Sequence, residues 1–227
     1  MWPRWMSHWC RINMVKKIAV RGVFETNAYF YMDETTNHGF LIDPGAEADK
    51  LLAMIAREGW VIEKILITHG HFDHIGAAEE ISKALGIPIY VHREGKKYMT
   101  NTLWNLSQVC RENITLKDVM YLEDQDMIAL EANSNFTLKV IHVPGHTLDG
   151  VVYYSENENV AFVGDTIFAG SIGRSDFYGG DAVQIVTGII LKIFSLPEHT
   201  ILYPGHSEPT TVGVEKEVQR QLLKQIL

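Results

Sequence analysis

The sequence predicts a single layered α/β domain in which two β-sheets are flanked by helices. Three observations lead to this expectation. The chain has 227 residues, of which 46% are hydrophobic and 21% are charged, as in a globular protein with a sizeable core. From residue 14 onward, short β-rich segments alternate with amphipathic helical segments. This pattern runs through both halves, and no linker or low-complexity tract separates them.

The first half is expected to open with a three-stranded meander and to continue as helix, strand, helix and strand. These segments are, in order, 16–20, 28–32, 39–43, 46–58, 64–68, 77–85 and 87–92. The strands are rich in β-branched and aromatic residues and are bounded by turn residues, such as Asp43-Pro44-Gly45 after the third. Leu51, Leu52 and Ile55 give the first helix one apolar face.

The second half repeats the strand and helix pattern after a polar stretch, 93–118, that we expect to be partly helical. The expected segments are strands at 127–130, 136–143, 151–155 and 160–163, a Gly-rich loop at 164–180, a helix at 181–194, a strand at 200–203 and a helix at 213–227. Asp181 is a good N-cap for the first of these helices. The Glu and Lys residues of the last helix are expected on a solvated face.

Composition disfavours several classes of protein. A net charge of −8 offers no basic field for a nucleic acid. Cys10 and Cys110 are in no paired spacing, so we expect neither a disulfide framework nor a thiolate metal site, and a reducing, cytoplasmic setting. No apolar run is long enough to span a bilayer. Residues 1–13 lack any period, so we expect a loose arm or an upstream start, followed by one domain over residues 14–227.

The strongest chemical signal is a run of ligand residues after the strand at 64–68. His69, His71, Asp73 and His74 lie within six residues, where a strand gives way to a helix. Residues two apart on an extended segment project to the same side, so His69 and His71 can share one ion. Asp73 and His74 then point elsewhere as the helix begins. The turn can therefore serve two neighbouring cations, and the alternative is a His-rich surface turn.

Three more ligand candidates each follow an apolar segment, and so lie at the end of a strand. They are His146, Asp165 and His206. Open α/β folds place their sites at such strand ends. With the first cluster they make five His and two Asp. Because a carboxylate can bridge two cations, seven ligands would give each ion four, which suits a two-metal site.

Some neighbouring residues could orient the ligand imidazoles through hydrogen bonds. Asp43 and Thr68 flank the metal loop, and Thr147 and Thr166 follow ligand candidates. His142 could act in the same way, but it is more simply a structural histidine of its strand.

These motifs resemble those of hydrolases with the metallo-β-lactamase fold, and in particular the small, single-domain, glyoxalase II-like (hydroxyacylglutathione hydrolase-like) branch. The matching text is THGHFDH (68–74), PGHT (144–147), GDTIFAGSIGRSD (164–176) and LYPGH (202–206). The resemblance implies an αββα sandwich that holds two divalent metal ions, zinc first, with iron and manganese as alternatives. It implies a first metal on His69, His71 and His146, a second on Asp73, His74 and His206, and Asp165 as a bridge.

The resemblance also implies a reaction, the hydrolysis of a small-molecule acyl thioester of the S-lactoylglutathione type. Two cations would make hydroxide available at neutral pH, and Asp73 is the candidate general base. A thiolate leaving group, with a pKa near ~8.5, needs no general acid. In the Gly-rich loop, Arg174 and Tyr178 could contact the substrate; alternatively, Arg174 forms an ion pair with Asp176 that braces the loop. The oligomeric state stays open.

The chain also departs from its relatives. It ends 21 residues after His206, where glyoxalase II continues into a helical domain that contributes to the glutathione pocket, so recognition of glutathione stays open. Asp165 stands where common zinc β-lactamases have Cys, and Phe168 where lactone hydrolases have Tyr. A rival function is a persulfide dioxygenase with one iron on His69 or His71, His146 and Asp165. A metal-holding protein without turnover is a third possibility.

Overall fold

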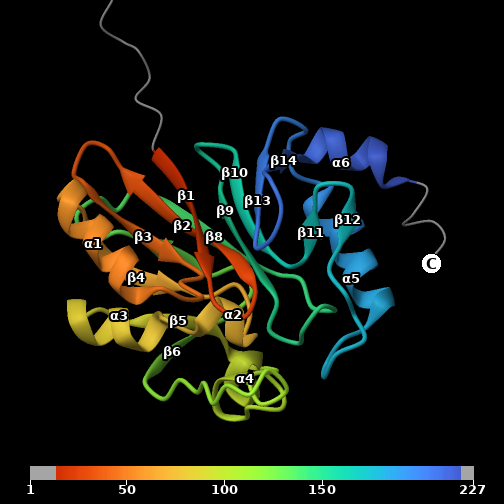
Figure 1. The fold of residues 1–227 in the computed structure, drawn as a ribbon. Coiled ribbons are helices and arrows are strands. Elements are labelled where there is room, and N and C mark those ends of the chain that lie inside the picture. Colours follow the sequence, from red (N-terminus) through yellow and green to blue (C-terminus); the bar gives the residue numbers. More distant parts are fainter. Residues whose placement is uncertain (1–13, 221–227) are drawn as a thin grey trace, which may run out of the picture.

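The computed structural model describes residues 14–220, which form four layers in the order helix, sheet, sheet, helix (Figure 1). This arrangement confirms the predicted αββα sandwich. The arm expected at residues 1–13 and the end of the helix expected at 213–227 lie outside the described residues. None of the described helices is long and apolar enough to cross a membrane.

The first sheet has the order β1-β2-β3-β4-β5-β6. Its strands are β1 (Met14–Arg21), β2 (Glu25–Asp33), β3 (His38–Ile42), β4 (Val61–Leu66), β5 (Ile89–His92) and β6 (Val119–Leu122). The first three form the predicted antiparallel meander, and β3 to β6 run parallel. Helices α1 (Ala48–Glu58) and α3 (Ala78–Leu85) cover its outer face, because their apolar residues, such as Leu51, Ile55 and Ile81, are buried against it.

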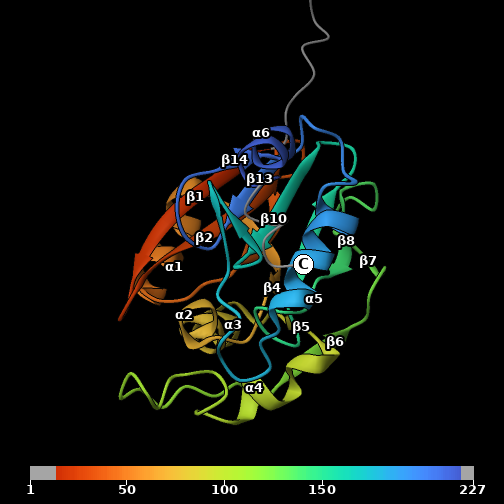
Figure 2. The same ribbon diagram turned by 90° about the vertical axis from the view of Figure 1, so that its right-hand side faces the viewer.

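The second sheet has the order β14-β13-β10-β9-β8-β7. Its strands are β7 (Met127–Ala129), β8 (Thr137–His142), β9 (Val151–Ser155), β10 (Val160–Gly164), β13 (Ile201–Pro204) and β14 (Thr210–Thr211). Helices α5 (Ala182–Gly188) and α6 (Val212–Val218) lie on its outer side, toward the viewer in Figure 2. Asp181 caps α5 as predicted, since its side chain accepts hydrogen bonds from the amides of Val183 and Gln184 at 2.9 Å.

The space between the sheets is filled by aromatic side chains from both of them. Tyr29 and Tyr31 of β2 pack on Phe162 of β10, with ring centroids 5.5 and 5.4 Å apart. Tyr31 also packs on Phe136, at 4.4 Å. These rings are fully or almost fully buried and hold the two sheets at a fixed separation. These side chains therefore form the core between the two sheets.

The stretch 93–118 is partly helical, as predicted, with the short η1 (Arg93–Gly95) and α4 (Lys96–Thr100). The strand β6 that follows it was not predicted. The Gly-rich loop contains a small hairpin of β11 (Ile167–Phe168) and β12 (Ser171–Ile172), and α5 continues as the π-helical turn η2 (Ile189–Ile193).

The expectation of a wholly solvated face on the last helix is wrong for Glu215, which is buried. Its carboxylate accepts hydrogen bonds from the amide of Gly170 at 2.9 Å and from the hydroxyl of Thr210 at 2.6 Å. These contacts tie α6 to the hairpin in the Gly-rich loop.

Strand direction brings distant loops to one edge of the sandwich. Strands β8 and β10 are both antiparallel to β9, and β13 is parallel to β10, so all three end on the same side. Strand β4 of the first sheet ends at this edge too, beside the short α2 (Phe72–Ile75) and above α4 in Figure 1. The ligand candidates follow these four strands.

Candidate metal centre

The turn after β4 divides its ligand candidates between two directions, as the sequence predicts. His71 is extended, with φ −68° and ψ 147°, and α2 begins at the next residue. His69 and His71 therefore precede the helix, whereas Asp73 and His74 lie in its first turn. All four side chains are buried or nearly so.

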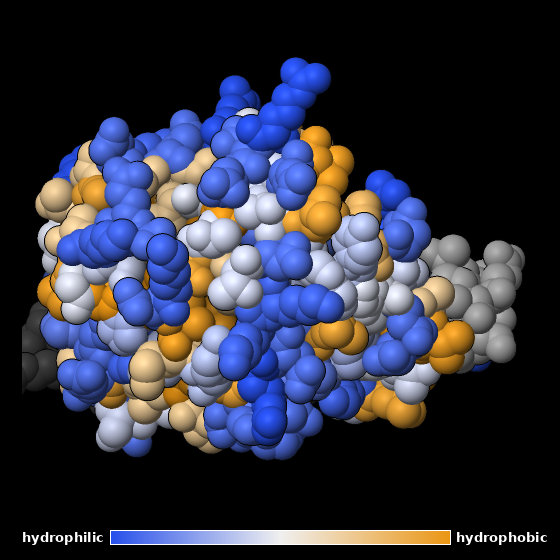
Figure 3. All heavy atoms as spheres, turned by 90° about the horizontal axis from the view of Figure 1, so that it is seen from below, coloured by the Kyte–Doolittle hydropathy of each residue, from blue (hydrophilic) through white to orange (hydrophobic). Residues whose placement is uncertain are grey.

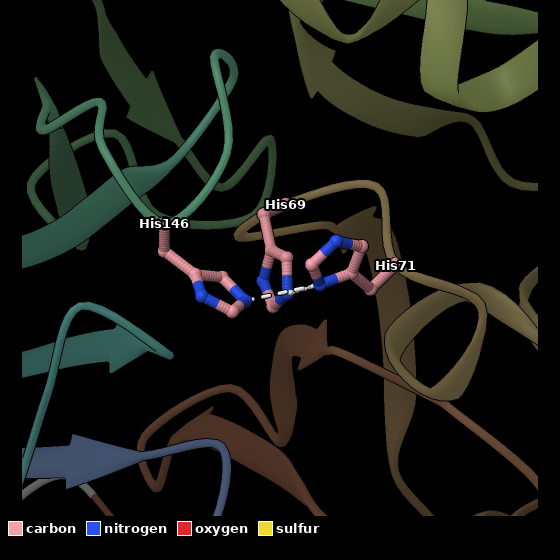
Figure 4. Close-up of side chains that lie close together, drawn as sticks. All are labelled: His69, His71 and His146. Atoms are coloured by element: carbon pink, nitrogen blue, oxygen red, sulfur yellow. Dashed lines mark hydrogen bonds between the residues drawn. The ribbon is translucent and has the colours of Figure 1, made fainter. Parts of the chain in front are cut away.

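His69, His71 and His146, here called the first triad, turn their rings toward one another (Figure 4). The Nδ1 atom of His71 lies 3.1 Å from Nε2 of His69 and 3.0 Å from Nε2 of His146. Two of these rings come from the loop after β4 and the third from the loop after β8. Three ring nitrogens at this separation are a suitable donor set for one cation.

Asp73, His74 and His206 form a second group, here called the second triad. Nε2 of His206 lies 3.3 Å from Oδ2 of Asp73, and Nε2 of His74 lies 3.8 Å from the same oxygen. Gly205 permits this approach, because a Cβ at that position would collide with the ring of His74 and with Asp165.

Asp165 lies between the two triads. Its Oδ2 is 3.6 Å from Nε2 of His146 and 3.5 Å from Nε2 of His206, and its Oδ1 is 3.4 Å from Nε2 of His74. The carboxylate therefore faces ligand nitrogens of both groups. The structure brings all seven predicted metal-ligand candidates into one cluster.

Some buried polar atoms of the cluster have no hydrogen-bond partner in the protein, as expected for atoms that would bind a cation. Within residues 14–220, Nε2 of His74 and Oδ1 of Asp165 are buried in the cluster without a hydrogen-bond partner. Buried polar atoms are normally paired, and orphaned ones mark a missing ion or water. An all-nitrogen and oxygen donor set of this kind suits zinc, iron or manganese.

Hydrogen bonds behind the cluster fix which nitrogen is free to bind a metal in three of the five histidine rings. Nδ1 of His146 donates to the carbonyl of Arg174 at 2.6 Å, and Nδ1 of His206 donates to the carbonyl of Glu25 at 2.8 Å. A carbonyl only accepts, so the lone pair of each ring is on Nε2, which faces the cluster. The bond of 2.8 Å between Nδ1 of His74 and Oδ2 of Asp43 orients the third ring in the same way. This is the bracing role that the sequence suggested for Asp43.

Charges in the cluster also favour cation binding. Burial, and then the neighbouring His146, lower the pKa of His71 to about 3, which keeps that ring neutral. Burial alone would lower the pKa of His74, but the carboxylates of Asp165, Asp43 and Asp73 outweigh it and raise that pKa well above its usual range. A site whose field holds a proton so firmly would also attract a metal ion.

The two predicted substrate residues have other partners. The guanidinium of Arg174 forms a two-pronged pair with Asp176, at 2.9 and 2.7 Å, and lies 4.4 Å from the ring centre of Phe177. This is the ion pair that the sequence offered as the alternative. The half-exposed ring of Tyr178 stacks on Trp104 at 5.7 Å. Contact of either side chain with a substrate stays a prediction.

Sequence reasoning missed two residues near the cluster. The hydroxyl of Thr26 donates to Oδ2 of Asp73 at 3.1 Å, across the interface between β2 and α2. The carboxyl of Asp149 is fully buried against Gly70, between the first two ligands, and burial raises its pKa to about 7. Nothing in the local sequence distinguishes either one. His142, by contrast, stacks on His92 at 4.0 Å and donates to the carbonyl of Leu148, so it is structural.

Comparison with known proteins identifies relatives along most of the chain. The profile of the Metallo-beta-lactamase superfamily matches residues 21–206. A probable metallo-hydrolase, YqgX of Bacillus subtilis, is 35% identical over 86% of this chain and 92% of its own length. The hydroxyacylglutathione hydrolase GloC of Haemophilus influenzae is 32% identical over 85% of this chain and 91% of its own.

Two solved structures share both fold and sequence with this chain. The BLEG-1 B3 metallo-beta-lactamase superposes with a TM-score of 0.84 at 36% identity, over 90% of this chain and 97% of that one. TTHA1623, solved in a di-iron-bound form, superposes with a TM-score of 0.80 at 32% identity, over 90% of this chain and 98% of that one. The relatives thus include hydrolases of different names and a protein that holds two iron ions.

Proposed function

This chain belongs to the metallo-β-lactamase superfamily, and from that premise we propose that it is a dinuclear metal hydrolase of acyl thioesters. S-lactoylglutathione is the first substrate to test, because GloC, a hydroxyacylglutathione hydrolase, is 32% identical. The ligand set alone does not select one reaction, since related sites serve several chemistries.

The position of Asp165 is the observation that carries the proposal. Its two oxygens face His74, His146 and His206, and so both triads, within 3.6 Å. A site for one metal would need only one triad and this carboxylate. It would leave the other triad as a largely buried group of titratable side chains with no role, which is costly for a folded protein.

Each residue of the cluster has a proposed part. The first triad would hold one cation, the second triad would hold another, and Asp165 would bridge them. Bound there, two divalent cations supply Lewis acidity and a nucleophilic hydroxide at neutral pH. Asp73 is the proposed acceptor for a proton of the nucleophile, and the hydroxyl of Thr26, at 3.1 Å, orients its carboxylate. A thiolate with a pKa near ~8.5 can leave without a general acid.

The first test is the metal content of protein purified without added metal or chelator, with zinc, iron and manganese measured together. Close to two ions per chain are expected, together with hydrolysis in a panel of thioesters. A β-lactam belongs in the panel because BLEG-1 is named as a B3 metallo-beta-lactamase. One ion per chain, all of it iron, with oxygen uptake on a persulfide, would refute the hydrolase and support the dioxygenase.

The second test is Asp165→Ala, which removes the proposed bridge. Both metal content and thioester hydrolysis should fall, whereas Asp118→Ala, a change at an exposed carboxylate outside the cluster, should affect neither. Full retention of metal and activity in Asp165→Ala would disprove the bridging role.

A further inference from the structure

A cavity of about 220 Å³ adjoins the metal cluster on the side of Asp73. It lies between the β1–β2 hairpin, the start of α1, α2 and residues 112–114 of the loop that precedes β6. Asp73 is common to the cavity lining and to the second triad. A substrate whose reactive bond lies at the cluster would therefore place one of its two ends near this cavity.

The wall of the cavity is largely apolar. Phe72 and Val20 are buried there, whereas Val23 and Phe24 of the hairpin are about half exposed at its mouth. The ring of Phe24, at the mouth of the cavity, packs on the buried ring of Phe72, with centroids 5.8 Å apart. Figure 3 shows the face that carries α4, where hydrophobic side chains are visible among hydrophilic ones. An apolar wall of this kind favours the binding of an alkyl or aryl group of a ligand.

Every charged residue in the lining is acidic. Besides Asp73 these are Glu47, Glu80 and Glu112, and the described lining contains no Lys, Arg or His. The charge of Glu47 is compensated by Lys50, whose Nζ lies 2.8 Å from its carboxylate. Glu80 and Glu112 are exposed at the rim. The rim therefore repels anions on approach and tolerates neutral or cationic groups.

We propose that this cavity binds an apolar, uncharged or cationic end of the substrate, and that Glu80 and Glu112 discriminate against an anionic end. The inference rests on the proposed function and narrows its substrate class. Glutathione carries two carboxylates and one ammonium group, so a glutathione thioester would have to direct its thiol portion away from the cavity. A thioester of a small neutral or cationic thiol would fit it directly.

The test measures the binding of thioethers, which cannot be hydrolysed, to the metal-loaded protein by calorimetry. One series keeps an S-butyl group and varies the thiol from glutathione to N-acetylcysteamine to cysteamine, that is from anionic to neutral to cationic. A second series keeps N-acetylcysteamine and compares S-butyl with S-(3-carboxypropyl). The two series separate the thiol end from the acyl end as the occupant of the cavity.

In one of the two series, the neutral member should bind about threefold to tenfold more tightly than the anionic member at low salt, and less so at high salt. The double substitution Glu80→Gln and Glu112→Gln should remove most of this difference. Glu79→Gln is the matched control: it lies beside Glu80 on α3, but its carboxylate pairs with Lys83 at 2.7 Å and does not line the cavity. Phe24→Ala should weaken the binding of all butyl compounds.

Preference for the anionic member, or a charge preference that the double substitution leaves unchanged in both series, would overturn the inference. Failure of the proposed function is a separate result. If the thioethers bind in the expected order but no thioester is hydrolysed, the cavity assignment stands and the proposed reaction does not.

Discussion

The substitution Asp43→Asn tests whether a hydrogen bond behind the cluster selects the metal-binding nitrogen of His74. Asp43 is buried, and its Oδ2 accepts from Nδ1 of His74 at 2.8 Å and from the hydroxyl of Thr68 at 2.6 Å. Its Oδ1 accepts from the amide of Thr68 at 2.7 Å. The residue has a φ of 50°, which Asn tolerates well, so the backbone should not change.

Asn keeps one acceptor for the amide of Thr68 but presents an NH₂ group to His74. Nδ1 of His74 must then accept, which moves its proton to Nε2, the atom that faces Asp165. A protonated Nε2 cannot bind a metal. Loss of such a supporting bond costs about 10-fold to 100-fold in metal affinity, or about 1.4 to 2.8 kcal/mol.

The assay is a titration of each variant with zinc against a competing chelator. Asp33→Asn is the matched control, because Asp33 is equally buried and accepts hydrogen bonds from Thr35, Thr36 and Asn133, away from the cluster. It should lower the free energy of unfolding but leave zinc affinity unchanged. If Asp43→Asn binds zinc within about twofold of the unmodified protein, the argument from the tautomer of His74 is wrong.

Three further predictions concern stability. Burial raises the pKa of Asp149 from 3.8 to about 7, so ionisation of this carboxyl destabilises the folded state increasingly from about pH 4 to about pH 8. In urea denaturation, the free energy of unfolding of Asp149→Asn should rise relative to that of the unmodified protein by up to about 4 kcal/mol across this range. A difference that does not change with pH would contradict the assignment. Asp181→Ala removes the cap of α5 and should cost about 1 kcal/mol in the same assay, whereas no loss would mean that water replaces the cap. Chelation should lower the Tm and added zinc should restore it, since ligands that bind only the folded state stabilise it; an unchanged Tm would show that the cluster holds no metal.

Much of the fold was predictable because it is encoded by local periodicity. The meander, helix α1 and the strands that end before each ligand candidate follow from apolar patterns of period 2 or 3.6. Strand β6 was missed because it has only four residues, and Met120 and Tyr121 in it are about half exposed, so no alternation marks it. Glu215 was misassigned because a helical pattern cannot reveal that the loop at Gly170 folds over that side of α6.

The set of ligand candidates that the fold brings together was also predictable, since four of them lie within one short turn and the others each follow an apolar strand. Chemistry of this kind is local: residue type decides what can bind a cation, and spacing decides which side chains share a side of the chain. The profile of the family matches residues 21–206, a range that includes all seven ligand candidates.

Only the tertiary structure decided how these residues cooperate. His146 contacts His71, which is 75 residues away in the sequence. Nδ1 of His206 donates a hydrogen bond to the carbonyl of Glu25, which is 181 residues away. The cavity beside Asp73 lies between a hairpin near the start of the chain and Glu112, and no sequence pattern connects the two. Such contacts depend on the closure of two sheets over one core, which is a property of the whole chain and of no single segment.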